Sequence, residues 1–221
     1  MARMAVEDRR HALVDAAVRV IARDGVAGAT TRAVVAEAGM SLASLHYAFP
    51  SRDHLLEAVI ARVTAQERRA AEAGLLPLEG APAGTDPRSL EEVVRDGLER
   101  YVELLAADPE RERALLEVAL YAMRVPGQRA ALVAQYDVYR EAACASLTTA
   151  ARTTGSRWTV PLDDAARALV MMTDGLTTTW LADRDTAAAL RSARFAARSV
   201  AALAEPDDVA PDPDREDVGA H

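Results

Sequence analysis

The sequence predicts an all-α protein with an N-terminal helix-turn-helix head and a C-terminal helical bundle. Ala, Leu, Val, Arg and Glu dominate its 221 residues, and aromatic residues make up 4% of them, a composition that favours helices. Apolar residues recur at helical spacing in several long segments. Near residue 39, two short helical stretches meet at a glycine turn, which is the sequence form of a helix-turn-helix.

The first predicted helix spans residues 8–23. Its apolar stripe consists of Leu13, Ala16, Ala17, Val20 and Ile21. This spacing places them on one face of a helix, which Asp24 and Gly25 then end. Arg9 and Arg10 stand at its start, where they either reach a DNA phosphate or belong to a solvated helix face.

The helix-turn-helix follows directly. Thr30 or Thr31 can cap a short helix that runs to Ala38, because a side-chain oxygen at that position accepts an otherwise unpaired backbone N–H. Gly39 closes this helix, since a left-handed residue costs glycine little. Ser41 then caps a second short helix.

The second short helix covers residues 42–49 and is the predicted recognition helix. The residues expected to point inward from the two helices are Val34, Ala38, Leu45 and Phe49. In a helix-turn-helix, the second helix enters the DNA major groove and the first crosses the backbone. The turn pattern alone leaves an ordinary αα-hairpin as the alternative.

A long fourth helix is predicted over residues 52–73. Pro50 stops the recognition helix, and Ser51 caps the next one. The inner face of this fourth helix carries Leu55, Leu56, Val59, Ile60 and Val63. It joins the head to the rest of the chain.

Residues 10–60 resemble the TetR family of transcriptional regulators. The resemblance rests on Thr30, Val34-Val35, Ala38-Gly39, Ser41, the run from Leu45 to Phe49, Ser51-Arg52-Asp53 and Leu55-Leu56. Two positions depart from the family pattern: His46 stands where an aromatic residue is common, and Val35 where a small one is common. The resemblance implies a homodimeric repressor. Its heads would read an inverted repeat in double-stranded DNA, and its C-terminal helices would dimerise and bind a small effector.

The resemblance also implies roles for individual residues. Those expected at DNA phosphates are Thr31, Arg32, Tyr47 and Arg52, and those expected at base edges are Leu42, Ala43, Ser44 and His46. Leu42 and Ala43 are apolar and therefore suit thymine methyl groups better than hydrogen-bonded readout. Phosphate placement and DNA shape would supply the remaining discrimination.

Beyond residue 65 the resemblance weakens and the helices are predicted from their own signals. Residues 74–87 are rich in Pro and Gly and predict a flexible connection. The following helices are expected over residues 89–108, 109–123, 128–153, 163–183 and 186–204. From residue 205 onward the chain is rich in Pro and Asp and predicts a disordered tail.

The C-terminal helices carry candidate effector-binding residues. The large apolar and aromatic side chains expected to face inward are Tyr101, Leu105, Leu116, Tyr121, Met123, Tyr136, Met171, Met172 and Trp180. Such residues suit an adaptable apolar cavity, although plain core packing is the commoner role for any one of them. Asp174 interrupts this apolar pattern and either sits in water or pairs with a polar group of the effector.

The last two helices are rich in alanine and are the predicted dimer interface. The alanines are Ala165, Ala166, Ala168, Ala187, Ala188, Ala189, Ala193, Ala196, Ala197, Ala201 and Ala202. Small side chains let helices approach closely, either across a subunit interface or within one chain. The family resemblance favours the interface.

The net charge of −8 divides unevenly along the chain. The head, residues 1–54, has seven Arg and six Asp or Glu, a balance of +1. The ligand-binding and dimerisation region, residues 55–204, has a balance of −3, and the tail, residues 205–221, has −6. The head is therefore only weakly basic, so specific contacts must add to bulk attraction for DNA.

Other classes of protein fit poorly. The sequence has no metalloenzyme histidine motif, no nucleophile elbow and no phosphate-binding glycine loop, so we expect neither an enzyme nor a cofactor or metal. Cys144 is the single cysteine, which excludes an internal disulfide and fits the cytoplasm. No apolar run approaches the ~18 residues of a membrane span.

The sequence therefore predicts a ligand-responsive transcriptional repressor, released from an inverted-repeat operator by a small apolar or aromatic effector. One alternative is an effector-independent dimeric DNA-binding protein whose C-terminal part only dimerises. A second is a helical enzyme whose head binds no nucleic acid.

Overall fold

The computed structural model describes residues 5–75, 82–125, 127 and 129–207, with the side chains of residues 64 and 66–75 excepted. The helices are α1 Val6–Gly28, α2 Thr31–Ala38, α3 Leu42–Ala48, α4 Arg52–Leu75, α5 Leu90–Ala107, α6 Pro109–Arg124, α7 Arg129–Thr154, α8 Leu162–Asp183 and α9 Thr186–Ala201, and the strands are β1 Ser156–Trp158 and β2 Ala204–Pro206. The predicted all-α class is confirmed.

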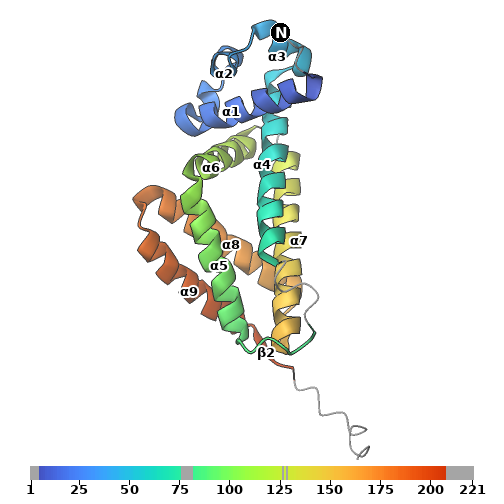
Figure 1. Cartoon of the computed structure of the whole chain (residues 1–221), viewed down its shortest axis with the longest axis vertical. Coiled ribbons are helices and arrows are strands. Elements are labelled where there is room, and N and C mark those ends of the chain that lie inside the picture. The colour runs from blue at the N-terminus through green and yellow to red at the C-terminus, as the bar shows by residue number, and fades with distance from the viewer. Residues whose placement is uncertain (1–4, 76–81, 126, 128, 208–221) are drawn as a thin grey trace, which may run out of the picture.

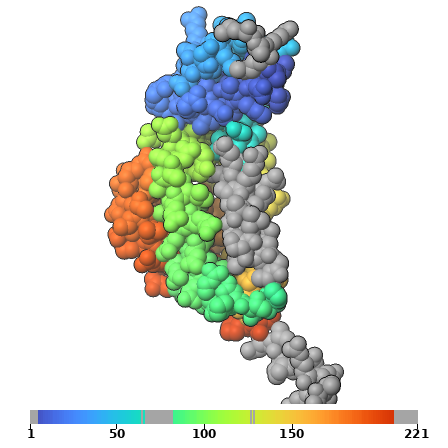
Figure 2. Space-filling model, in the orientation of Figure 1, coloured from blue at the N-terminus to red at the C-terminus, as the bar shows by residue number. Residues whose placement is uncertain are grey.

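The molecule is elongated, with the head at one end (Figure 1). Helix α1 lies across the top of the long helix α4, and α2 and α3 stand on the far side of α1 from the body. Helices α4 and α7 run side by side down the molecule, while α5, α8 and α9 form its other flank. Figure 2 shows the head resting directly on α6 and the upper part of the body.

The buried apolar residues form two cores. The N-terminal core joins α1, α2 and α3 to α4 as far as Val63, and it also includes Ala114 and Val118 of α6. These two α6 residues are 0% and 3% exposed. The head is therefore closed by a helix of the body, and the boundary between the cores does not fall at residue 54.

The first and last helices differ from their predicted bounds. Helix α1 continues to Gly28, but its helical geometry breaks at Gly25, where φ is 71° and ψ is 172°. Helix α9 ends at Ala201 instead of residue 204, because Ala204–Pro206 pairs with Ser156–Trp158 as an antiparallel strand. Strands this short carry too little periodicity for recognition in the sequence.

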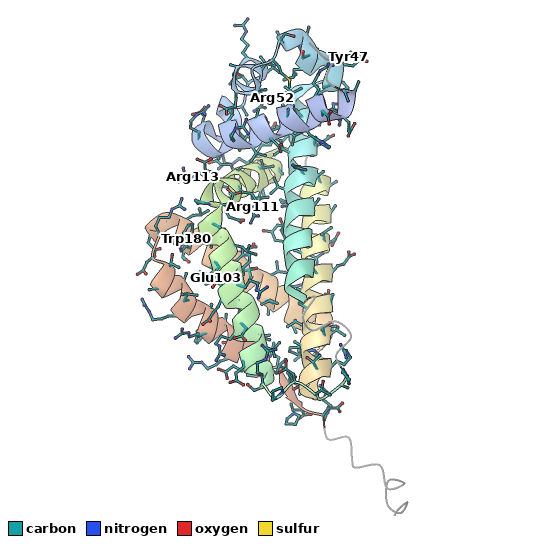
Figure 3. All side chains as sticks on the ribbon, in the orientation of Figure 1. Tyr47, Arg52, Glu103, Arg111, Arg113 and Trp180 are labelled. Atoms are coloured by element: carbon teal, nitrogen blue, oxygen red, sulfur yellow. The ribbon has the colours of Figure 1, made fainter. Side chains whose placement is uncertain are left out.

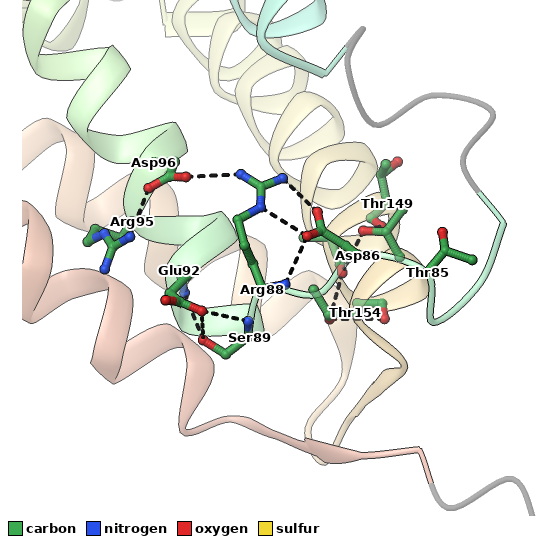
Figure 4. Close-up of polar contacts among 12 residues, drawn as sticks. Thr85, Asp86, Arg88, Ser89, Glu92, Arg95, Asp96, Thr149 and Thr154 are labelled. Atoms are coloured by element: carbon green, nitrogen blue, oxygen red, sulfur yellow. Dashed lines mark hydrogen bonds and ion pairs between the residues drawn. The ribbon is translucent and has the colours of Figure 1, made fainter.

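The base of the body is fixed by backbone hydrogen bonds. The N–H groups of Gly84 and Asp86 donate to the carbonyls of Arg152 and Thr153 at 2.9 and 3.0 Å. Arg88 pairs with Asp86 at 2.6 Å, as Figure 4 shows. The flexible connection predicted over residues 74–87 is therefore tied to α7 at residues 84 and 86, and its residues 74 and 75 belong to α4. Residues 76–81 lie outside the described part.

Helix α5 begins at this base with the predicted serine cap. Ser89 Oγ accepts the N–H of Glu92 at 3.2 Å, and the Glu92 carboxylate accepts the N–H of Ser89 at 2.8 Å. This reciprocal capping box satisfies two backbone donors at the helix start. The tail that we predicted to be disordered starts at Glu205, which the structure places within β2. Residues 208–221 of this tail lie outside the described part.

None of the described helices is both long enough and apolar enough to cross a membrane.

Candidate nucleic-acid interface

Local side chains fix the two short helices of the head. Thr30 Oγ1 accepts the N–H of Ala33 at 3.1 Å, and Ser41 Oγ accepts the N–H of Ser44 at 3.2 Å. Between these caps, Gly39 has φ 63° and ψ 31°, a left-handed geometry that glycine adopts without steric cost. The capping and turn residues predicted from the sequence therefore occupy their predicted positions.

Helix α3 buries one face and exposes the other. Leu45 is fully buried, whereas Leu42 and Tyr47 are 39% and 67% exposed. The candidate DNA-contacting residues that α3 exposes are Leu42, Ala43, His46 and Tyr47. Ser44 is half-buried and shares a 3.0 Å hydrogen bond with the capping Ser41. Apolar and polar groups are thus presented together on one helix surface.

Helix α2 adds a cation to this surface. Arg32 is exposed, and Thr31 before it is partly exposed. Within the described part of the chain, no carboxylate pairs with the Arg32 guanidinium. Its charge is therefore available to a phosphate, and we call the surface formed by Thr31, Arg32, Leu42, Ala43, His46 and Tyr47 the reading surface.

Two arginines of α1 support helix α3. Arg10 Nη1 donates to the Ala48 carbonyl at 2.8 Å, and its guanidinium lies 4.5 Å from the centroid of the Phe49 ring. The Arg9 guanidinium lies 5.8 Å from the Tyr47 ring centroid. Arg10 therefore braces the end of α3, while Arg9 stands next to the most exposed aromatic residue of the reading surface.

An ion-pair network ties α2 to α1. Glu37 accepts a hydrogen bond from Arg19 at 2.7 Å and one from Arg23 at 3.2 Å. These bonds, that of Arg19 first, lower the pKa of Glu37 and keep its carboxylate charged. The network sets the position of α2 without using Arg32.

The structure does not bring Arg52 to the reading surface. Its Nε donates to the Ala29 carbonyl at 3.0 Å, and its Nη2 donates to the Val26 carbonyl. Its guanidinium also lies 5.8 Å from the ring centroid of Tyr121 on α6. It turns inward to carbonyls at the C-terminal end of α1, where intrahelical donors run out, and the Val26 carbonyl also accepts the N–H of Ala29 at 3.2 Å. Arg52 therefore links α1 and α4 with Tyr121 of α6. Figure 3 labels it in the head, beside α1.

The candidate effector-binding residues fall into two groups. Tyr101, Leu105, Tyr136, Met172 and Trp180 lie in or against the C-terminal core. Tyr121 instead packs against the N-terminal core, and Met123 is 58% exposed. The structure thus gathers most of the predicted set in the body and places Tyr121 at the junction with the head. Helical periodicity shows which residues share a face, but not which core that face meets.

Most of the alanines assigned to a dimer interface are buried within one chain. Those in the C-terminal core are Ala165, Ala166, Ala189, Ala193, Ala196 and Ala197. They let α9 pack closely on α5 and α8. Large apolar side chains point outward instead, since Met171 of α8 and Phe195 of α9 are 65% and 64% exposed.

Two comparisons of the sequence identify the family. Residues 13–59 match the model described as "Bacterial regulatory proteins, tetR family". The nicotine-responsive transcriptional repressor HdnoR of Paenarthrobacter nicotinovorans is 30% identical over 181 residues, which cover 82% of this chain and 88% of HdnoR. The chain belongs to the TetR family.

Solved structures agree with this family in fold. A putative TetR-family transcriptional regulator from Mesorhizobium loti superposes with a TM-score of 0.74 at 16% identity, covering 91% of this chain and 99% of that one. The multidrug binding protein EbrR, in complex with imidazole, superposes with a TM-score of 0.58 at 28% identity and covers 87% of this chain and 94% of its own. The protein is therefore a DNA-binding TetR family transcriptional regulator.

Replacing Arg52 by alanine should destabilise this regulator. The Ala29 carbonyl would lose its Arg52 donor and the Val26 carbonyl would keep only the Ala29 N–H, and we expect a loss of about 1–3 kcal/mol in the free energy of unfolding. Urea unfolding followed by circular dichroism measures the effect. Arg32→Ala is the matched control, because Arg32 is exposed and should leave stability unchanged. Equal stability of the two variants would contradict the bracing role of Arg52.

Proposed function

We propose that the protein is a dimeric repressor that a small molecule releases from an inverted-repeat operator. In this proposal the head, residues 1–54, reads DNA, and residues 55–204 dimerise and bind the effector. The observation that carries it is the reading surface. There, an arginine with no described carboxylate partner, an exposed tyrosine and exposed apolar side chains stand on a helix-turn-helix of a TetR family chain.

The reading surface suits a duplex in two ways. Arg32 and Tyr47 can place the head on phosphates, because a guanidinium and a phenol both donate to phosphate oxygens. Leu42 and Ala43 offer apolar contacts at the start of α3, the end of a recognition helix that reaches the base edges. Thymine methyl groups are the matching feature of the major groove. His46 adds a group that can donate or accept a hydrogen bond.

Dimerisation is supported by the outward faces of α8 and α9. Met171 and Phe195 are large apolar residues that are well exposed in the single chain. Two copies of such a face can cover each other around a twofold axis. The dimer would then hold two copies of α3 about one DNA turn, ~34 Å, or somewhat more apart.

Effector binding is supported by the body and by the relatives. Aromatic residues and methionine gather in or against the C-terminal core, and such linings adapt to apolar or aromatic ligands. HdnoR is nicotine-responsive, and EbrR was solved with imidazole. Both observations therefore favour a small aromatic effector that binds in the body.

The junction at α6 can couple effector binding in the body to the position of the head on DNA. Helix α6 contributes to the N-terminal core, and Tyr121 on it lies beside Arg52. An effector that binds one arrangement of α6 better than another would shift the head with it, by a coupling free energy of typically ~1–3 kcal/mol.

Selection of bound duplexes from a random DNA library tests the proposed operator. We expect enrichment of an inverted repeat whose half-sites hold one recognition helix each. Enrichment of an asymmetric site, or of none, would overturn the proposal. For the effector-independent alternative, the test is thermal melting against a library of small aromatic compounds, where a complete absence of stabilising compounds would favour that alternative.

Arg32→Ala should weaken DNA binding without changing the melting temperature. If each subunit loses one phosphate contact, the slope of log affinity against log salt should fall by roughly 2 per dimer. Fluorescence anisotropy at several salt concentrations measures this slope. Arg113→Ala is the control, since Arg113 is exposed on α6, away from α3 (Figure 3). An unchanged slope in Arg32→Ala would remove Arg32 from the reading surface.

Phe195→Glu should dissociate the dimer, because it places a charge in the face that two subunits would share. Sedimentation velocity should show a single-subunit species, and operator affinity should fall with it. Val133→Glu serves as the control, since Val133 on α7 is also an exposed apolar residue, at 51%. A dimer that survives Phe195→Glu but not Val133→Glu would place the interface elsewhere.

A further inference from the structure

One carboxylate of the body accepts a hydrogen bond from an aromatic hydroxyl. Asp174 lies on α8, and its Oδ2 accepts a hydrogen bond from the Tyr136 hydroxyl at 2.9 Å. In the described part of the chain this aspartate forms no ion pair, whereas Asp96, Glu99, Glu112 and Asp137 each pair with an arginine. The chain also contains no lysine that could pair with it. Among the described residues, Asp174 is therefore a negative charge without a paired cation.

The ring of Tyr136, which donates to this carboxylate, packs against a second tyrosine ring. The rings of Tyr136 and Tyr139 are 5.7 Å apart and meet edge to face at 71°. Both tyrosines pack against the C-terminal core, and Gln135, which is buried, donates to the Tyr139 hydroxyl. The two rings are thus held in place by packing and by a hydrogen bond.

The Asp174 side chain is accessible from solvent and partly covered by its neighbours. It is exposed on α8, and partial burial of the carboxyl group reduces its hydration. This desolvation raises the pKa of the Asp174 carboxyl, while the hydrogen bond from Tyr136 opposes the rise. A partly desolvated carboxylate is costly unless a cation compensates its charge.

We propose that Asp174, together with the tyrosine pair formed by Tyr136 and Tyr139, anchors the positive charge of the effector, which is therefore a small organic cation. The carboxylate supplies the opposite charge, and the tyrosine rings supply the cation–π attraction that quaternary ammonium groups and amines find in proteins. This inference rests on the proposed function, because it names the chemical class of the effector.

The geometry favours a cation over an anion or a neutral ligand. An anion would meet the repulsion of Asp174 without a described arginine to offset it. A neutral aromatic molecule could pack on the rings but would leave the carboxylate uncompensated. The buried Glu112 is not a competing anchor, because it already pairs with Arg111.

Binding of matched probes to the full-length protein tests the inference. The probes are phenyltrimethylammonium and benzyltrimethylammonium, each compared with its neutral carbon isostere, tert-butylbenzene and neopentylbenzene. Thermal melting and isothermal titration calorimetry provide the readouts. We expect the cations to stabilise the protein and to bind more tightly than the isosteres. Asp174→Asn, which keeps the shape of the side chain, should weaken cation binding by about tenfold or more.

The control is Asp164→Asn, which removes an exposed carboxylate from the same helix and should leave cation binding unchanged. Equal loss in both variants, or isosteres that bind as tightly as the cations, would overturn the inference. If neutral aromatic compounds stabilise the protein and the cations do not, the inference fails while the proposed function stands. If no probe and no library compound of any charge binds, ligand-responsive function fails as well.

Discussion

The packing of α6 against α1 is the contact on which the rest of the structure depends. Ala114 and Val118 of α6 complete the core that α1 to α4 leave open. Gly25 at this junction has a φ of 71°, which favours glycine, and a Cβ there would stand 3.3 Å from Glu117 Oε2 of α6. Arg52 adds a polar link at the same junction. The head is therefore not an independently packed domain, and its orientation depends on the body.

This arrangement would connect DNA binding with the effector binding that we propose. The reading surface lies at the far end of the head, held by the braces of Arg10 and Glu37. Tyr121 meets the head at α6, while the tyrosine pair and Asp174 lie on α7 and α8. A cation drawn to that pair would act on helices that contact α6. Because packed cores switch between discrete arrangements rather than deform continuously, a small shift there can move the head as a unit.

The features that the sequence predicted well are those that neighbouring residues determine. Thr30, Gly39, Ser41 and Ser89 act on backbone groups within a few residues, so their roles follow from local rules. Local rules could not predict the role of Arg52, because its carbonyl partners lie 23 and 26 residues away in the chain. The buried alanines of α9 posed the same problem. Their spacing indicates close packing, but only the fold reveals that α5 is the partner.

Amide hydrogen exchange of Val118→Ala tests most directly whether α6 controls the head. Val118 and Val102 are both almost fully buried, the first in the N-terminal core and the second in the C-terminal core. Both substitutions leave a similar cavity. If α6 completes the head core, Val118→Ala will reduce protection of the α2 and α3 amides, and Val102→Ala will not. Full protection of α2 and α3 in Val118→Ala would contradict the account.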